Sequence, residues 1–292
     1  MKSKLGGIFP SITTPFTDGR VNTEQLADNI EKYNGLALGG YMILGGNGEY
    51  LGLTPKETRT VAETITQNAR EGVTIVAGAG RESADATVAF IRDIADLRID
   101  IASVITPYYY AKYIGEENLI AYYTRVADLS PIPILIYNSP SYAAGVTISP
   151  QAAGKLSRHE NIVGMKNSSG VPISEYISEV AEEETFFFHS GKAARCYRDL
   201  CDGAVGATLS MAIYWPEVCI QLYDLFTQGK HNEAQRLGKQ IEMLNSAGPS
   251  KYGVPGVKYA MGLRGYHGGE TRLPLLPLSE AEKAQLDIVF KD

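Results

Sequence analysis

The sequence predicts a single parallel (β/α)8 TIM barrel, followed by an additional helical segment at its C-terminal end. First, strand-like runs and amphipathic helical patterns alternate along most of the chain. Second, the strand-like runs are apolar on both faces, as in a buried parallel sheet. Third, 292 residues with 44% hydrophobic content suit one large core. An open, doubly wound sheet shows the same alternation, and the sequence alone does not exclude it.

About eight strand-like runs are rich in β-branched and aromatic residues. They occupy residues 7–16, 41–46, 73–80, 101–110, 132–140, 161–168, 185–191 and 204–210. Helical patterns lie between them, and the segment 54–70 has a clear start. Thr54 is its predicted N-cap, Pro55 its first helical residue and Glu57 the partner in a capping box. Residues 115–130 show the same amphipathic character.

The pattern changes after residue 215, where no ninth strand follows. Long helical segments are predicted at 216–248, 256–266 and 279–291. We therefore expect a catalytic barrel over residues 1–215 and, over residues 216–292, C-terminal helices packed on the barrel or on a partner subunit. No low-complexity linker or short-period repeat indicates a further module.

Composition restricts the function classes. A net charge of −6 and a pI near 5.4 argue against a nucleic-acid partner, because phosphate contacts need clustered Lys and Arg. The three cysteines form no CxxC pair and the four histidines no HxxxH pair, so neither a metal site nor a disulfide framework is indicated. The N-terminus lacks the apolar core of a signal peptide, and no run is long enough for a membrane helix. We expect a cytoplasmic enzyme without cofactor or membrane partner.

Lys166 stands out because it directly follows the apolar run 162–165. The carboxyl ends of barrel strands meet at one mouth, where barrel enzymes keep their chemistry. Burial favours the neutral form of an amine, which attacks ketones to form a Schiff base. Tyr137, at the end of the preceding strand, offers a hydroxyl for the proton transfers. Alternatively, Lys166 extends to solvent and Tyr137 only packs.

The turn from Gly45 to Glu49 is rich in glycine and leads to a helix. Its backbone N–H groups can bind a carboxylate, and Asn47 adds a side-chain donor. No Walker motif or dinucleotide fingerprint is present here. Anion binding is therefore one interpretation of the turn, and a simple change of chain direction is the other.

The segments "GGNGEYLGLT", "TPYYY", "YNSP" and "GMKNSSG", in this order, resemble the dihydrodipicolinate synthase / N-acetylneuraminate lyase family of pyruvate-dependent class I aldolases. The resemblance covers essentially the whole chain. It implies that Lys166 forms a Schiff base with pyruvate, that Tyr137 relays protons and that Gly46 and Asn47 hold the pyruvate carboxylate. It also implies a homodimer, commonly doubled to a homotetramer, in which Tyr109 reaches into the neighbouring site.

Two positions depart from the family pattern. Gly46 stands where the family usually has Ser or Thr, so one hydroxyl of the proton relay is missing. Tyr142 stands where the synthase branch has an arginine for the carboxylate of its aldehyde substrate. A phenol does not replace a bidentate arginine–carboxylate pair, so this position argues against efficient synthase activity.

Other segments resemble the 4-hydroxy-2-oxoglutarate aldolase branch, namely "YTRVADLSPIPILIY", "NIVGMKNSSG" and "GVPGVKYAMGLRGYHGG". This resemblance implies a substrate-binding hydroxyl at Ser168, although a helix N-cap there is equally compatible with the sequence. We also expect Ala207, in the run 204–210, to take part in substrate binding.

The predicted function is a lyase that makes or breaks a carbon–carbon bond between pyruvate and an aldehyde or 2-keto acid, as 4-hydroxy-2-oxoglutarate aldolase does. Within the family, the alternatives are the dihydrodipicolinate synthase condensation and another 2-keto-3-deoxy acid aldolase. From a different class, a catalytically silent barrel that binds a keto acid is also compatible with the sequence.

Overall fold

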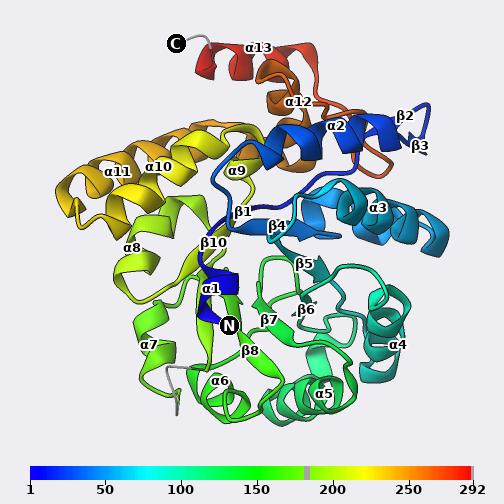
Figure 1. Ribbon diagram of the computed structural model, residues 1–292, viewed down its shortest axis with the longest axis vertical. Coiled ribbons are helices and arrows are strands. Elements are labelled where there is room, and N and C mark those ends of the chain that lie inside the picture. Colours follow the sequence, from blue (N-terminus) through cyan, green and yellow to red (C-terminus); the bar gives the residue numbers. More distant parts are fainter. Residues whose placement is uncertain (181–184, 291–292) are drawn as a thin grey trace.

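The computed structural model describes residues 1–180 and 185–290 (Figure 1). Within these residues, eight parallel strands form one sheet in the order β1-β10-β9-β8-β7-β6-β5-β4. They are β1 (Gly7–Pro10), β4 (Gly40–Ile43), β5 (Thr74–Gly78), β6 (Ile101–Ile105), β7 (Ile134–Asn138), β8 (Ile162–Asn167), β9 (Phe187–Ser190) and β10 (Gly206–Leu209). Two short strands, β2 (Phe16–Thr17) and β3 (Arg20–Val21), pair separately as an antiparallel hairpin.

The sheet closes on itself between β1 and β4. The N–H of Ile12 donates to the carbonyl of Met42 over 2.8 Å, and the N–H of Gly39 donates to Ile8 over 3.0 Å. Ser11 and Met42 form a parallel bridge beside these bonds. This closure confirms the predicted barrel and excludes the open, doubly wound sheet, which would leave both edge strands unpaired.

Each predicted strand-like run overlaps one barrel strand, and the strands are shorter than the runs. The excess lies mainly at the carboxyl ends. In the run 101–110, for example, β6 ends at Ile105 and the chain continues as a loop through Pro107. Proline has no N–H to donate to a ladder, so it cannot extend the pairing of a central strand.

Two apolar cores lie on the two faces of the strands. The outer core packs the strands against the surrounding helices. The inner core fills the lower part of the barrel with Leu5, Phe9, Met42, Val76, Ile101, Leu135, Val163 and Phe187. Because alternate residues of a strand face opposite sides, every barrel strand except β10 contributes to both cores.

Helices ring the strands (Figure 1). They are α2 (Thr23–Asn34), α3 (Pro55–Asn68), α4 (Ala84–Ile94), α5 (Glu116–Leu129), α6 (Pro150–Leu156), α7 (Ile173–Ile177), α8 (Cys196–Cys201) and α9 (Met211–Tyr214). The short helix α1 (Lys2–Leu5) lies inside this ring, and its Leu5 belongs to the inner core. The predicted start of α3 is confirmed, since Thr54 and Glu57 form both bonds of a capping box.

The C-terminal helices α10 (Pro216–Thr227), α11 (His231–Ala247), α12 (Gly253–Leu263) and α13 (Glu280–Val289) gather on one side of the barrel, next to α2 (Figure 1). The predicted helical segment 216–248 forms two helices, because the chain turns at Gly229 with a φ of 74°. Throughout the described part of the chain, every helix is too short or too polar to cross a bilayer.

Candidate active site

A cavity of about 430 Å³ opens at the carboxyl ends of the barrel strands. Residues in or just after all eight barrel strands line it, as expected for the mouth of such a barrel. The lining includes six residues predicted from the sequence: Gly46, Asn47, Tyr137, Tyr142, Lys166 and Ser168.

An irregularity in β8 places Lys166 in this cavity. Leu135 of β7 pairs with Gly164, whereas the residue before Leu135 pairs with Ile162, so Val163 is an extra residue in β8. Val163 faces the inner core, whereas Met165 faces the outer core. A strictly alternating strand would turn residue 165 inward after residue 163. The bulge shifts the alternation by one residue and turns Lys166 inward instead.

Glycine is required at the centre of this bulge. Gly164 has a φ of 155°, and a Cβ atom added there would overlap the carbonyl oxygen of Phe187 in β9. The same Cβ would lie 2.9 Å from the Phe187 nitrogen, closer than real Cβ contacts. The close approach of β8 and β9 thus depends on the absence of a side chain at residue 164.

Lys166 is buried, with 6% of its surface exposed. Its Nζ atom lies 4.1 Å from the ring centroid of Tyr137, its neighbour in the β7–β8 ladder. Among the described residues, none accepts a hydrogen bond from this amine or forms an ion pair with it. The amine therefore lies over an aromatic face with no acidic partner, available to a ligand in the cavity.

His189 is the neighbour of Lys166 in the β8–β9 ladder. Burial lowers its pKa to about 4, and the nearby Lys166 acts in the same direction. One ring nitrogen, Nε2, contacts the carbonyl of Leu5, and Nδ1 lies 3.0 Å from the Thr208 hydroxyl. At neutral pH the ring is therefore uncharged and adds no positive charge beside Lys166.

The glycine-rich turn forms the short 3-10 helix η1 (Gly46–Gly48) after β4. The backbone N–H groups of Gly46 and Asn47 donate to no acceptor in the described part of the chain. The Asn47 side-chain amide donates to the Ser210 hydroxyl over 2.8 Å, which ties the turn to the end of β10. Free backbone donors at the cavity wall are suited to an anionic oxygen.

A buried ion pair between Glu49 and Lys258 holds the end of this turn. Glu49, with a left-handed φ of 52°, contacts Lys258 of α12 over 2.5 Å. The Lys258 amine also donates to the carbonyl oxygens of Thr14 (2.8 Å) and Glu270 (2.5 Å), and the Arg272 N–H donates to Glu49 (2.9 Å). Burial lowers the pKa of Lys258, although Glu49 opposes this effect. The C-terminal segment is thereby joined to the cavity wall.

Three buried hydroxyl groups line the cavity without a hydrogen-bond partner among the described residues. They belong to Ser103, Ser139 and Ser168. Ser168 does not cap a helix, because Pro172 holds the N-cap position of α7. Buried hydroxyl groups are normally paired, so these three mark places where a bound molecule or water completes the bonding.

Two predicted residues lie outside the cavity lining. Tyr109 follows β6 with 76% of its surface exposed, while its neighbour Tyr108 lines the cavity. Ala207 is fully buried in β10, between Ile8 of β1 and Ser190 of β9. Thr208, next to it, lines the cavity.

Sequence reasoning missed Lys192, which lines the cavity directly after β9. It directly follows the predicted strand-like run 185–191, so examining every strand end for charge would have found it. Tyr50 was also missed. It lines the cavity after the glycine-rich turn, and burial raises its pKa to about 12, so it remains a hydrogen-bond donor.

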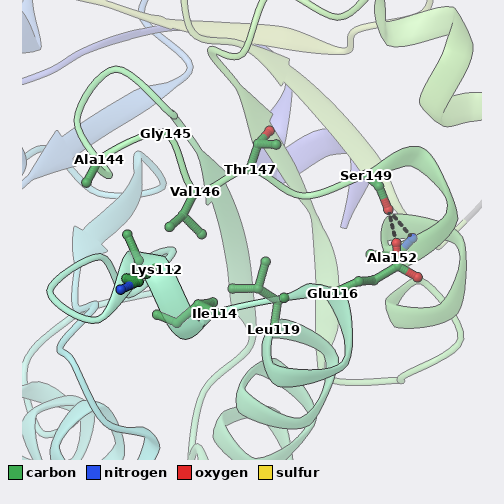
Figure 2. A pocket seen from close by; sticks show the side chains of 12 residues that line it. Lys112, Ile114, Glu116, Leu119, Ala144, Gly145, Val146, Thr147, Ser149 and Ala152 are labelled. Carbon is green, nitrogen blue, oxygen red and sulfur yellow. Dashed lines mark hydrogen bonds between the residues drawn. The ribbon is translucent and has the colours of Figure 1, made fainter.

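A second cavity lies between the start of α5 and the loop 144–149 (Figure 2). Its acidic residue, Glu116, already accepts a bond from Ser149 (2.5 Å) and pairs with Lys155 (3.2 Å). Aliphatic side chains such as Val146 form much of the remaining wall (Figure 2). Across the described ranges, no three His, Cys, Asp or Glu residues come together as possible metal ligands. The barrel mouth is thus the better candidate for chemistry.

Known proteins resemble the chain over its whole length. A model of the dihydrodipicolinate synthetase family matches residues 4–292. A 4-hydroxy-tetrahydrodipicolinate synthase from Methanothrix thermoacetophila is 32% identical over 289 residues, 98% of this chain and 96% of the relative. The crystal structure of dihydrodipicolinate synthase from Aquifex aeolicus has a TM-score of 0.88 at 28% identity, covering 98% of this chain and 97% of its own.

A prophage protein of the dihydrodipicolinic acid synthase family from E. coli K12, solved in complex with pyruvate, has a TM-score of 0.88 at 26% identity, with 98% of this chain and 97% of its own covered. The names of these relatives support the synthase alternative better than the 4-hydroxy-2-oxoglutarate aldolase interpretation. The family resemblance itself is confirmed, and with it the class of lyases and synthases to which the relatives belong. The chain belongs to the dihydrodipicolinate synthetase family.

Proposed function

We propose that this protein joins or cleaves a carbon–carbon bond between pyruvate and an aldehyde through a Schiff base on Lys166. The observation that carries the proposal is the unpaired Lys166 amine inside the barrel mouth, 4.1 Å from the Tyr137 ring. A buried amine without an acidic partner is disposed to react as a nucleophile. In a catalytically silent barrel the same lysine would act only as a cation for the keto acid, and it would form no imine.

The proposed reaction proceeds through an enamine. The Lys166 amine attacks the keto carbon of pyruvate and water leaves, which gives a protonated imine. Loss of a proton from the methyl carbon gives an enamine, whose carbon attacks the aldehyde while the aldehyde oxygen takes up a proton. Water then hydrolyses the new imine, which releases the product and restores the amine. We assign the proton transfers to the Tyr137 hydroxyl.

The pyruvate carboxylate is assigned to the glycine-rich turn. The free N–H groups of Gly46 and Asn47 support this assignment, because they offer two donors without a competing acceptor. Gly46 lacks the hydroxyl that the family usually has at this position. The backbone N–H groups compensate for this loss, because they donate hydrogen bonds without a side chain.

The second substrate has two candidates. The names of the relatives favour the synthase reaction, and the family resemblance implies aspartate semialdehyde as the aldehyde of that reaction. The lining of the cavity, among the described residues, contains no arginine, and Tyr142 at its rim is 72% exposed. This lining supports a smaller aldehyde, as in the 4-hydroxy-2-oxoglutarate aldolase reaction, because the bidentate partner of a distal amino-acid carboxylate is absent.

We also propose that the active form is a homodimer or homotetramer. Tyr109, Tyr110 and Tyr113 are 76%, 59% and 73% exposed on the loop after β6. Exposed tyrosines in one segment favour an interface with a second copy, where Tyr109 would complete the neighbouring site. Sedimentation of the intact protein tests this, and a fully active monomer at nanomolar concentration would contradict it. The boundary at residue 215 likewise stays a proposal.

Trapping of the imine tests the proposed function. The protein is incubated with pyruvate, reduced with borohydride and digested for mass spectrometry. We expect a reduced pyruvate adduct on Lys166 and none in Lys166→Ala. An unmodified wild-type protein would support the binding-only barrel and contradict the aldolase. A panel of aldehydes with pyruvate then separates aspartate semialdehyde from smaller substrates.

A further inference from the structure

We propose that the Ser11 hydroxyl is a further binding group for the pyruvate carboxylate and supplies the side-chain donor that Gly46 lacks. This inference rests on the proposed function and adds one residue, next to β1, to the same site. It concerns the ketone half of the reaction, so it can be tested without knowing the aldehyde.

The turn after β4 has room for one more donor. A Cβ atom added at Gly46 would meet nothing within 4 Å, so the space that the usual Ser or Thr would fill is open. One N–H of the Asn47 side chain is already bonded to the Ser210 hydroxyl over 2.8 Å. A carboxylate has about four acceptor sites, more than the two free backbone N–H groups of the turn can fill.

Ser11 brings a hydroxyl to the start of this turn. It directly follows β1 and forms a parallel bridge with Met42, beside the 2.8 Å bond from the N–H of Ile12 to the Met42 carbonyl. The Ser11 hydroxyl oxygen lies 3.2 Å from the position that a Cβ of Gly45 would take. Consecutive Cα atoms are about 3.8 Å apart, so this hydroxyl lies about one residue from the free N–H of Gly46.

The Ser11 hydroxyl is buried, unpaired and directed toward the cavity. Ser11 is 4% exposed and belongs to the cavity lining. Among the described residues, none forms a hydrogen bond with its side chain. Phe9, two residues earlier, belongs to the inner core, so Ser11 also faces the interior of the barrel. Buried hydroxyl groups are normally paired, which indicates that a bound group completes the bonding here.

Ser11 is better placed for this role than the other unpaired hydroxyl groups of the cavity. Ser103, Ser139 and Ser168 lie in or just after β6, β7 and β8, two to four strands away from β4. By contrast, β1 closes directly on β4. Gly45 keeps the hydroxyl accessible, since a Cβ atom there would press on its oxygen at 3.2 Å, closer than most real Cβ contacts.

The test measures the pyruvate concentration that half-saturates borohydride trapping on Lys166. In Ser11→Ala, we expect this concentration to rise roughly ten- to hundredfold, as for the loss of one hydrogen bond to a charged group. The adduct yield at saturating pyruvate should equal that of the wild type, because Lys166 keeps its place. Ser157→Ala, which removes a buried hydroxyl outside the cavity lining, should change neither quantity.

Gly46→Ser provides the second half of the test, because it returns a hydroxyl to the open space in the turn. Combined with Ser11→Ala, it should restore the half-saturating concentration to within about threefold of the wild type, whereas alone it should not raise it. An unchanged concentration in Ser11→Ala, a lower adduct yield at saturation, or a shift that Gly46→Ser does not reverse would each overturn the inference. Absence of the adduct in the wild type would instead overturn the proposed function.

Discussion

Replacing Gly164 with alanine should damage both the fold and the reactive lysine. The new Cβ would overlap the Phe187 carbonyl oxygen and lie 2.9 Å from the Phe187 nitrogen, at a φ of 155° that side chains rarely adopt. Strained backbone costs about 1–3 kcal/mol and overpacking about the same again, so we expect a loss of roughly 2–6 kcal/mol in the free energy of unfolding. That is a large share of the roughly 5–15 kcal/mol that stabilises a typical domain.

Loss of the bulge in β8 would also relieve this strain. Adduct formation on Lys166 measures this second outcome separately from unfolding. Without the extra residue, position 166 turns toward the outer core and the amine leaves the cavity. We therefore expect Gly164→Ala to lose most of the borohydride-trapped adduct, even at temperatures where it remains folded.

Urea unfolding at fixed protein concentration and adduct yield measure the two effects. Gly262→Ala is the matched control, because nothing lies within 4 Å of its added Cβ in α12. That variant should be neutral or more stable by about 0.5–1 kcal/mol, the helix propensity difference. If Gly164→Ala unfolds like the wild type and gives full adduct, the bulge does not orient Lys166.

Three further predictions concern the cavity and the buried His189 beside Lys166. Tyr137→Phe should lower kcat by roughly 10²–10⁴-fold, as for a lost acid–base group, with the fold intact by circular dichroism; a loss below tenfold would assign Tyr137 to packing. Tyr142→Arg should raise kcat/KM for aspartate semialdehyde over neutral aldehydes by about ten- to hundredfold, and an unchanged ratio would place Tyr142 outside substrate contact. His189 has a folded pKa of about 4 against 6.5 unfolded, so the unfolded state takes up its proton first as the pH falls. The free energy of unfolding should therefore drop by up to about 3 kcal/mol between pH 6.5 and 4, and His189→Gln should lack this part of the slope in urea titrations; an identical slope would contradict it.

The alternation of strands and helices was predictable because its signal is local. Apolar runs and helix starts are properties of neighbouring residues in the chain. The structure has a strand at each predicted run and a capping box at Thr54. Closure was not predictable, because the bonds from Ile12 and Gly39 join strands whose contact depends on the tilt of the whole sheet. The end of the run 101–110 was overestimated because the loop after β6 has the aromatic composition of a strand.

The candidate site was predictable where chemistry and strand position coincide in one residue. Lys166 and Tyr137 could be selected this way, but the reason that Lys166 points inward could not. Simple alternation after Val163 would have directed Met165 into the cavity, and only the glycine between them hints at a bulge. The pairing of Glu49 with Lys258 could not be predicted either, because no local pattern links residues so far apart in the chain.

That pairing connects helix α12 to the proposed anion site. Glu49 follows directly on the turn whose N–H groups are proposed to receive a carboxylate, and Lys258 is its buried counterion. A chain shortened before α12 would leave an uncompensated negative charge behind that turn. The unpaired Glu49 carboxylate would then repel an anion bound at the turn, even with every barrel residue intact. Loss of α12 would thus weaken the proposed binding of the pyruvate carboxylate.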